Sequence, residues 1–248
     1  MRILGINNNY NTKPNFKGFE RTVYKAGKPS LDEYISHRNN TYALRMDINW
    51  TSLAKTAFEK YKDVDKVFTT FYACSDGRET QSFLIALDSL FAETATEKFC
   101  PIIAKDYDPF VINKAKKNFY EFSEEEIRRI NKISGGKFQE YNEPISKLDN
   151  KYKATKKLTD RIFYEVGDFT KEYQILPKEN IILGIRNCWP YFSMTNQYTL
   201  PKKLCNHFDR NAMLLLGEFD FTTQEKTDFI QNGFETSEDL TLRNIYIK

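Results

Sequence analysis

The hydrophobic positions along this 248-residue chain repeatedly change period, from runs typical of strands to the 3.6-residue spacing of helices. Short runs rich in β-branched, aromatic and aliphatic residues, most of them followed by small or polar residues, indicate buried strands. The predicted strands, in chain order, are Val67–Ala73, Pro101–Ala104, Arg161–Val166, Ile181–Ile185, Ala212–Leu216 and Thr241–Ile247.

Helical spacing fills most of the segments between these strands. Asp108 is a good N-cap because Pro109 takes the first helical position, and Ser123 with Glu126 forms a capping box for a helix that Gly135 ends. The predicted helices span residues 31–60, 83–91, 108–120, 123–134 and 195–207. Strands that alternate with helices predict an α/β fold whose parallel, doubly wound sheet is covered on both faces.

Two segments interrupt this alternation. Residues 1 to about 30 are rich in Asn, Lys, Gly and Pro and have little apolar period, which indicates a loosely ordered extension. Residues 136–160 are polar and lysine-rich, and Lys137–Tyr141 and Asn150–Ala154 can form the strands of one hairpin. We therefore expect a partly helical extension over 1–38 and one α/β domain over 39–248, with a short insertion at 134–160.

Composition narrows the class of protein. Hydrophobic residues make up 40% and charged residues 29%, which argues against disorder, and a net charge of +3 argues weakly against a nucleic-acid partner. The four cysteines form no C-x-x-C pair, so reduced thiols fit better than zinc or disulfides. No apolar stretch approaches eighteen residues, and the start has too short an apolar run for a signal peptide. We expect a cytoplasmic protein without membrane insertion.

The residues that follow the strands carry the candidate chemistry, because ligands of open α/β sheets bind beyond the carboxyl ends of the strands. The first strand runs into a small-residue turn whose Gly77 permits close backbone approach to a ligand. One glycine is too few for a dinucleotide fingerprint or a phosphate loop. Asp106 follows the second strand and can accept hydrogen bonds from both ribose hydroxyls.

The next two strand ends extend this pattern. Asp168 and Phe169 follow the third strand and can offer an acceptor to an adenine amino group and a face to its ring, and Arg186 and Asn187 follow the fourth. Each residue alone is usually a turn or cap residue. Matching chemistry at four strand ends indicates a site for an adenosine without phosphate, and S-adenosylmethionine is the obvious candidate.

Five motifs in order resemble the chemotaxis-receptor glutamate O-methyltransferases of the CheR type, over about residues 37–220. The family's turn has two successive acids, of which Glu79 keeps the second and Arg78 replaces the first, and Asp168–Phe169 stands where the family often has Asn-Leu. The segments similar to the family's motifs are Asn39–Arg45, Ala73–Ser82, Asp106–Asp108, Arg186–Phe192 and Leu214–Gly217.

The resemblance implies a bacterial, cytoplasmic S-adenosylmethionine-dependent methyltransferase with a Rossmann-like, seven-stranded, doubly wound sheet and no metal. Arg45 and Tyr191 are implied nearest the departing methyl, as the catalytic pair. The residues implied to surround S-adenosylmethionine, and S-adenosylhomocysteine after transfer, are Asn39, Thr41, Arg45, Ala73, Glu79, Asp106, Tyr107, Asp168, Phe169, Arg186 and Asn187.

The acceptor expected from the resemblance is a carboxylate, such as a protein glutamate side chain. A carboxylate is already ionised at neutral pH and needs no general base. Receptor-modifying members of the family have a helical domain before the first motif and a β-subdomain, whereas 38 residues precede Asn39 here and the corresponding insertion is short. Methylation of a small molecule by the same fold, and a binding module without transfer activity, therefore stay as alternatives.

Overall fold

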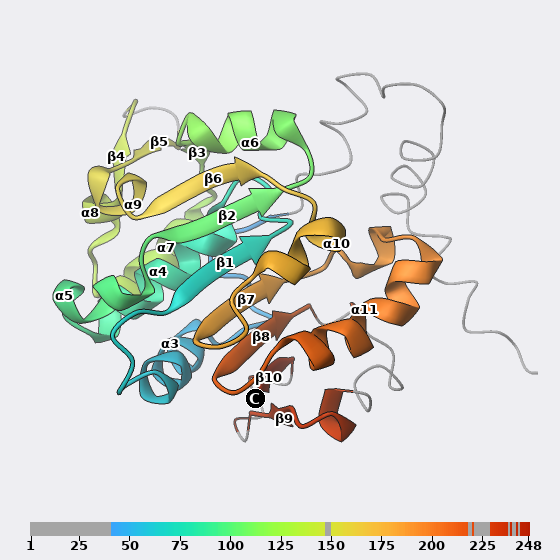
Figure 1. Cartoon of the computed structure of the whole chain (residues 1–248). Helices are drawn as coiled ribbons and strands as arrows, with labels where there is room; N and C mark the ends of the chain where they lie inside the picture. Colours follow the sequence, from blue (N-terminus) through green and yellow to red (C-terminus); the bar gives the residue numbers. More distant parts are fainter. Residues whose placement is uncertain are drawn as a thin grey trace, which may run out of the picture.

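The computed structural model describes residues 41–146, 150–217, 220, 229–237, 239, 242 and 244–248 (Figure 1). Its main element is a seven-stranded sheet with the strand order β6-β2-β1-β7-β8-β10-β9. The strands of this sheet are β1 Phe68–Tyr72, β2 Ile102–Asp106, β6 Ile162–Val166, β7 Ile181–Ile185, β8 Ala212–Leu216, β9 Glu235–Thr236 and β10 Ile245–Ile247.

The sheet confirms the predicted α/β, doubly wound fold class. Strands β6, β2, β1, β7 and β8 are parallel, and the chain order reverses between β1 and β7. The prediction of a parallel sheet misses one feature, because β10 pairs antiparallel with both β8 and β9. Figure 1 shows the arrowheads of the parallel strands at one edge of the sheet, where a ligand of such a fold binds.

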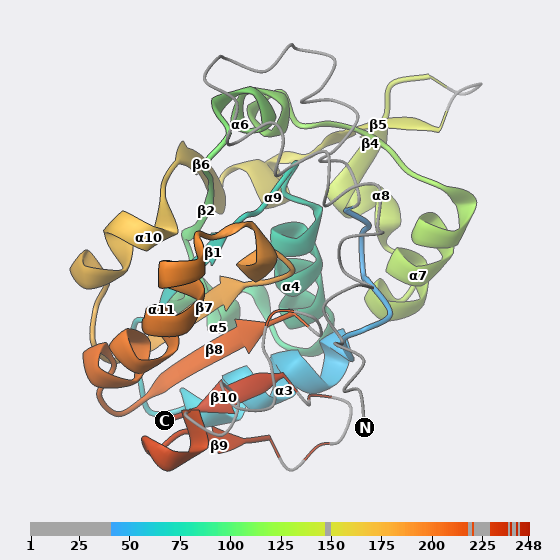
Figure 2. The ribbon, with the colours of Figure 1, turned by 90° about the vertical axis from the view of Figure 1, so that its right-hand side faces the viewer.

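Helices cover both faces of the sheet (Figures 1 and 2). Two of the longer ones, α3 and α4, lie on one face, and α10 and α11 lie on the other. The helices are α3 Trp50–Lys60, α4 Arg78–Leu90, α5 Glu93–Thr96, α6 Pro109–Lys116, α7 Glu124–Ser134, α8 Phe138–Tyr141, α9 Lys156–Thr159, α10 Phe169–Glu172 and α11 Met194–His207, with the 3-10 turns η3 Glu97–Phe99, η4 Tyr173–Ile175 and η5 Trp189–Tyr191.

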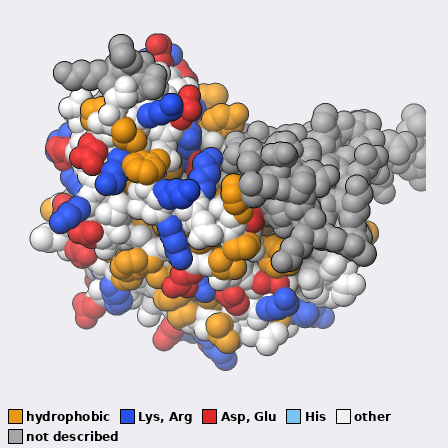
Figure 3. Space-filling model, turned by 90° about the horizontal axis from the view of Figure 1, so that it is seen from above, with side chains coloured by type: hydrophobic (Ala, Val, Ile, Leu, Met, Phe, Trp, Pro, Cys, Tyr) orange, Lys and Arg blue, Asp and Glu red, His pale blue; other side chains and the backbone are white. Residues whose placement is uncertain are grey.

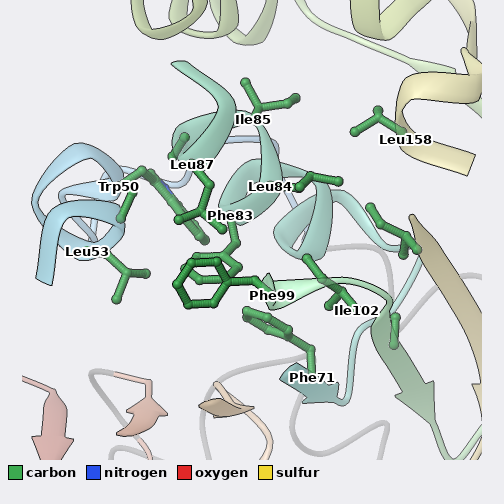
Figure 4. Close-up of a cluster of buried hydrophobic side chains, with 14 of the residues drawn as sticks. Trp50, Leu53, Phe71, Phe83, Leu84, Ile85, Leu87, Phe99, Ile102 and Leu158 are labelled. Carbon is green, nitrogen blue, oxygen red and sulfur yellow. The ribbon is translucent and has the colours of Figure 1, made fainter. Parts of the chain in front are cut away.

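The core consists of one apolar cluster on each face of the sheet. On the first face, Trp50 and Leu53 of α3 and Phe83 of α4 pack toward Phe71 and Ile102 of the sheet (Figure 4). Each of these side chains is at most 2% exposed, and burying a side chain of this size contributes about 1.5–3 kcal/mol. The cluster on the second face joins β7 and β8 to α10 and α11. Both helical layers are thereby fixed to the strands that end at the candidate site.

The predicted helix over residues 31–60 is wrong in its described part before Trp50. Leu44 has a left-handed backbone with φ 51°, and Asn49 is the N-cap of α3, its side chain accepting from the Ser52 N–H at 3.1 Å. Residues 31–40 lie outside the described residues, as does Asn39 of the first motif. The extension over 1–38 stays a prediction.

A second, three-stranded sheet has the order β3-β5-β4, with β3 Phe119–Glu121, β4 Asn142–Pro144 and β5 Lys151–Ala154. The predicted strand at 150–154 is confirmed. The predicted strand at 137–141 is wrong, because Phe138 and Tyr141 lie one turn apart on α8 and are both buried. The predicted helix to residue 120 ends at Lys116, since Asn118 is left-handed with φ 57° and the next residues pair with β5.

The predicted caps are confirmed. Asp108 accepts from the Phe110 N–H at 2.9 Å, Ser123 and Glu126 close the capping box, and Gly135 ends α7 with φ 67°. All four cysteines are buried and free. Within the described part of the chain, no helix is long and apolar enough to cross a membrane.

Candidate active site

The turn after β1 is held against the end of β2. The Asp106 carboxylate accepts from the backbone N–H of Ser75 at 3.0 Å and from that of Asp108 at 3.0 Å, and the Cys74 N–H donates to the carbonyl of Lys105 at 3.0 Å. Ala73, at the start of the turn, has φ 54° and is exposed. Asp106 thus joins the ends of β1 and β2, and its contact with a ribose stays a prediction.

Gly77 caps the helix that follows this turn, and the space that a side chain would take there is already filled. Its φ is 89°, and a Cβ placed there would lie 2.4 Å from the Cε1 and the hydroxyl oxygen of Tyr164, which comes from β6. The close approach that the sequence predicts at Gly77 is therefore made with this tyrosine ring. Close approach of a ligand to the backbone of this turn stays a prediction, and the side where a Cβ would stand has a packing role.

Asp168 and Phe169 lie at the end of β6, where the sequence predicts them. Asp168 caps α10, accepting from the backbone N–H of Thr170 at 3.0 Å and its hydroxyl at 2.7 Å, and it pairs with Lys171 at 3.0 Å. Burial raises the pKa of Asp168, but these partners outweigh it and the pKa is lowered. The Phe169 ring is buried, 5.1 Å from the ring of Tyr72.

Tyr107 is the exposed aromatic ring next to the candidate ribose acid. Its side chain is 64% exposed, directly after Asp106. Tyr107 follows β2, which pairs with β6, the strand that leads to α10. Tyr107 is thus better placed than the buried Phe169 to offer a ring face to a ligand.

Arg186 is the centre of a buried ion-pair network at the end of β7. Its guanidinium binds Glu79 at 2.7 Å and Asp47 at 2.8 Å, and its side chain is 2% exposed. Burial lowers the pKa of Arg186, but the two carboxylates outweigh it and the pKa is raised. Asp47 also pairs with Arg45 at 3.4 Å, so two cations and two anions alternate from the interior toward the surface.

Asn187 has a left-handed backbone with φ 57°. The Asp220 carboxylate holds this backbone by hydrogen bonds. The Asp220 carboxylate accepts from the backbone N–H of Asn187 at 2.6 Å, of Trp189 at 3.0 Å and of Gly217 at 2.5 Å. Burial, the largest effect, raises the pKa of Asp220. The Asn187 Oδ1 is buried and has no hydrogen-bond partner within the described part of the chain. A ligand with a donor group fits this orphaned acceptor.

Sequence reasoning misses two of these residues, Asp47 and Asp220. Asp47 follows the first motif by two positions, and Asp220 stands three positions after Gly217, which ends the last motif. The closeness of both acids to motif residues is a sequence signal that could have marked them as site residues. Neither acid directly follows a strand, which is the position where site residues are expected. Their partners Arg186 and Asn187 are distant in sequence, so the pairing is visible only in the fold.

The two residues predicted nearest the methyl group occupy different surroundings. Arg45 has a side chain that is 26% exposed, and its carbonyl accepts from the Trp50 indole N–H at 2.9 Å. Tyr191 ends the turn η5 and packs, partly buried, on the second core cluster beside Phe192. Thr41 lies in the described chain before Arg45, and Asn39 lies outside the described residues.

A buried thiol adjoins the residues that follow β7. The Cys188 thiol follows Asn187, and burial raises its pKa well above the usual value, helped by the carboxylates of Asp220, Asp106 and Glu79. These acids come from the ends of β8, β2 and the start of α4. Direct contacts join the strand ends, since Arg186 after β7 binds Glu79 of α4 at 2.7 Å and Asp106 of β2 accepts from Ser75 after β1 at 3.0 Å.

A cavity of about 840 Å³ opens beside the turn after β1. Thr41 is the predicted site residue that lines it, and Asp76 and Arg78 line it from the turn. The small sheet supplies the opposite wall, and the lining there comprises Phe119, Tyr120, Glu121, Phe122, Ile145, Asn150 and Lys151. Among the predicted cofactor residues that the structure describes, Thr41 alone lines this cavity, which extends to Ile145 and Lys151 at the insertion.

Two further properties of the described chain bear on partners. No group of three or more metal-ligating side chains occurs in residues 41–146, 150–217 or the described residues beyond them. Figure 3 shows that both basic and acidic side chains are spread over the face seen from above.

The chain belongs to the CheR methyltransferase family. Residues 39–237 match the family model described as CheR methyltransferase, SAM binding domain. S-adenosylmethionine is therefore the cofactor, and the protein is an S-adenosylmethionine-dependent methyltransferase. The orphaned Asn187 Oδ1 and the acids at the strand ends fit this cofactor, which carries ammonium and hydroxyl donors. No curated protein sequence matches the chain.

Solved structures with a similar fold include several methyltransferases. Magnesium protoporphyrin IX methyltransferase from Synechocystis, solved with bound S-adenosylmethionine, is 11% identical with a TM-score of 0.38, over 94% of this chain and 86% of that one. Precorrin-6y C5,15-methyltransferase from Geobacter metallireducens is 8% identical with a TM-score of 0.39, over 81% of each chain. Because these scores are below 0.5, the family assignment depends on the family model.

Proposed function

We propose that this enzyme transfers the methyl group to a carboxylate, such as a glutamate side chain of a protein. The observation that supports this most is the ion-pair network that runs from the buried Arg186 through Asp47 to Arg45. Arg45 is the more exposed of the two guanidinium groups, with 26% of its side chain exposed against 2% for Arg186. A forked guanidinium at the more exposed end of the network suits an incoming carboxylate.

The chemistry of a carboxylate acceptor matches the residues of the site. The cofactor supplies an electrophilic methyl group on a positively charged sulfur. A carboxylate is ionised at neutral pH, so no residue has to remove a proton from it. Charge is lost as an anion approaches a cation, so a site that excludes water and aligns the acceptor lowers the barrier.

The candidate residues divide the cofactor and the acceptor between them in this proposal, and Arg45 borders both. Asp106 accepts from the ribose hydroxyls, and Asp168 accepts from the adenine amino group beside the exposed ring of Tyr107. The Asn187 Oδ1, which has no partner among the described residues, accepts from a cofactor donor. Thr41 and Glu79 border the amino-acid end of the cofactor. The ion pair with Arg186 at 2.7 Å fixes the Glu79 carboxylate.

Tyr191 orients the acceptor in this proposal. It follows Trp189, whose indole N–H donates to the Gln197 carbonyl at 3.3 Å and whose backbone N–H is held by Asp220. The turn η5 is thereby fixed at two points between β7 and α11. A half-buried tyrosine on a fixed turn can present its hydroxyl to a carboxylate without a large loss of side-chain entropy.

The test is the fate of a radioactive methyl group. The full-length protein is incubated with methyl-labelled S-adenosylmethionine and an extract of its own cells. Base-labile label on protein, which is the property of a methyl ester, is the expected result. Label confined to small molecules would transfer the assignment to a small-molecule methyltransferase. No label with cofactor binding intact would make the protein a binding module.

A matched pair of variants tests the role of Arg45 in the same assay. Arg45→Ala removes the proposed acceptor clamp, and we expect at least about a tenfold loss of base-labile label, the size of a lost charge-assisted hydrogen bond. Arg128→Ala removes a guanidinium that is 72% exposed on α7, and it should leave the label unchanged. Equal activity of both variants would remove Arg45 from the mechanism.

A further inference from the structure

Glu126, in the first turn of α7, is a buried carboxylate with four hydrogen bonds. Its Oε2 accepts from the Ser123 backbone N–H at 2.9 Å and from the Ser123 hydroxyl at 3.0 Å. Its Oε1 accepts from the Ala43 backbone N–H at 2.8 Å and from Arg78 Nη1 at 2.9 Å. The side chain is 3% exposed. The first oxygen caps its own helix, whereas the second holds two distant parts of the chain.

Arg78 links Glu126 to the turn after β1 and to the small sheet. Its Nε lies 3.2 Å from Asp76 in the turn, and its Nη2 donates to the Glu121 carbonyl of β3 at 2.8 Å. The guanidinium also lies 5.1 Å from the ring centre of Phe122. Arg78, which stands where the related pattern has an acid, thus binds Glu126 and the small sheet, whereas Glu79 binds Arg186.

Hydrogen bonds to two side chains hold the segment that leads to Arg45. The Ala43 N–H is held by Glu126, and the Leu44 N–H donates to the Ser82 hydroxyl oxygen at 2.8 Å. Ser82 in turn donates to the carbonyl of Arg78 at 2.6 Å. Leu44 has φ 51°, a conformation that costs a residue with a side chain about 1–2 kcal/mol. Specific hydrogen bonds are therefore needed to keep this backbone in place.

We propose that Glu126 and Ser82 are positioning residues that fix residues 43–44 so that Arg45 reaches the cofactor and acceptor. This inference rests on the place given to Arg45 under the proposed function. Each Glu126 oxygen accepts from two donors at once. A glutamine amide must put an N–H₂ group where one of these oxygens stands, so Glu126→Gln breaks one set of contacts at constant volume.

The test is a set of double-mutant cycles read out by S-adenosylhomocysteine affinity, measured calorimetrically on folded protein. Arg45→Ala, Glu126→Gln and Ser82→Ala should each weaken binding, the first by about tenfold or more. Combining Glu126→Gln or Ser82→Ala with Arg45→Ala should cause no further loss, because the positioning residues act through Arg45. Glu125→Gln, on an exposed neighbour paired with Arg128, is the control that should bind normally.

The outcomes separate the two levels of the argument. Unchanged affinity of Arg45→Ala would refute the placement of Arg45, and with it this inference. A weakened Arg45→Ala protein together with normal affinity of Glu126→Gln and Ser82→Ala would overturn the positioning role alone, as would losses that add in the double variants. If Glu126→Gln does not fold, Ser82→Ala decides, because it removes one hydroxyl and leaves the capping box of α7 in place.

Discussion

Gly77→Ala tests whether the turn after β1 is packed as the structure has it. The new Cβ would lie 2.4 Å from two atoms of the Tyr164 side chain, which is fixed in the core, at a φ of 89°. The left-handed backbone costs about 1–2 kcal/mol, and overpacking costs about 1–3 kcal/mol more. Gly136→Ala is the matched control, because φ there is 87° but no atom lies within 4 Å of the new Cβ.

Urea denaturation of both variants isolates the steric part of this cost. Gly77→Ala should be less stable than Gly136→Ala by about 1–3 kcal/mol, equivalent to about 2–12 °C in Tm for a chain of this size. Adding Tyr164→Leu removes the ring atoms that the Cβ meets and should give a favourable coupling in the double variant. Equal stability of the two alanine variants would show that Tyr164 does not fill the space beside Gly77.

Three other predictions follow from the contacts of single residues. Asp106→Ala should weaken S-adenosylhomocysteine binding by about tenfold to a hundredfold, measured by calorimetry, because two hydrogen bonds to a charged acceptor are lost; unchanged affinity would remove the ribose assignment. Burial raises the pKa of Glu126, but the N–H groups that it accepts from and Arg78 outweigh it, so the folded pKa lies below the usual 4.5. The ionised Glu126 therefore stabilises the folded protein above pH 4.5, and this contribution is lost as the pH falls through the folded pKa. In urea titrations from about pH 5 to about pH 3, the free energy of unfolding of Glu126→Gln should therefore fall less than that of the parent protein. Parallel curves for the two proteins would contradict this. Arg161→Met leaves the buried Asp88 carboxylate without its bidentate partner at 2.7 and 3.0 Å and should cost about 3–5 kcal/mol, with much of the loss recovered when Asp88→Leu is added; an uncorrected double variant would argue against the pair.

Local patterns predict those parts of the fold that local physics determines. The buried runs of β7 and β8 and the caps at Asp108 and Ser123 are confirmed, since each depends on neighbours in sequence. Local patterns do not determine the secondary structure of short amphipathic segments. Phe138–Tyr141 suits a strand or a single helical turn, and tertiary burial of its two aromatic rings favours the helix. The reversed direction of β10 likewise has no local signal.

The candidate site likewise contains residues that the sequence predicts and residues that only the fold reveals. The positions of Asp106, Asp168 and Asn187 are predictable because each is the last residue of a strand or lies two positions after one, and a parallel sheet brings such positions to one edge. Asp220 is not, because its partner Asn187 lies 33 positions away and no period connects them. The role of Gly77 is also hidden, since the ring that fills its bare face belongs to another strand.

The central claim is that the ends of β1, β2, β6 and β7 hold the cofactor with its sulfur directed toward Arg45 and Tyr191. A crystal structure with S-adenosylhomocysteine tests it most directly. The account predicts the ribose within hydrogen-bond distance of Asp106, a ligand donor on the Asn187 Oδ1, and the sulfur facing a pocket that Arg45 borders. A ligand bound elsewhere, or a ribose that does not touch Asp106, would contradict the account.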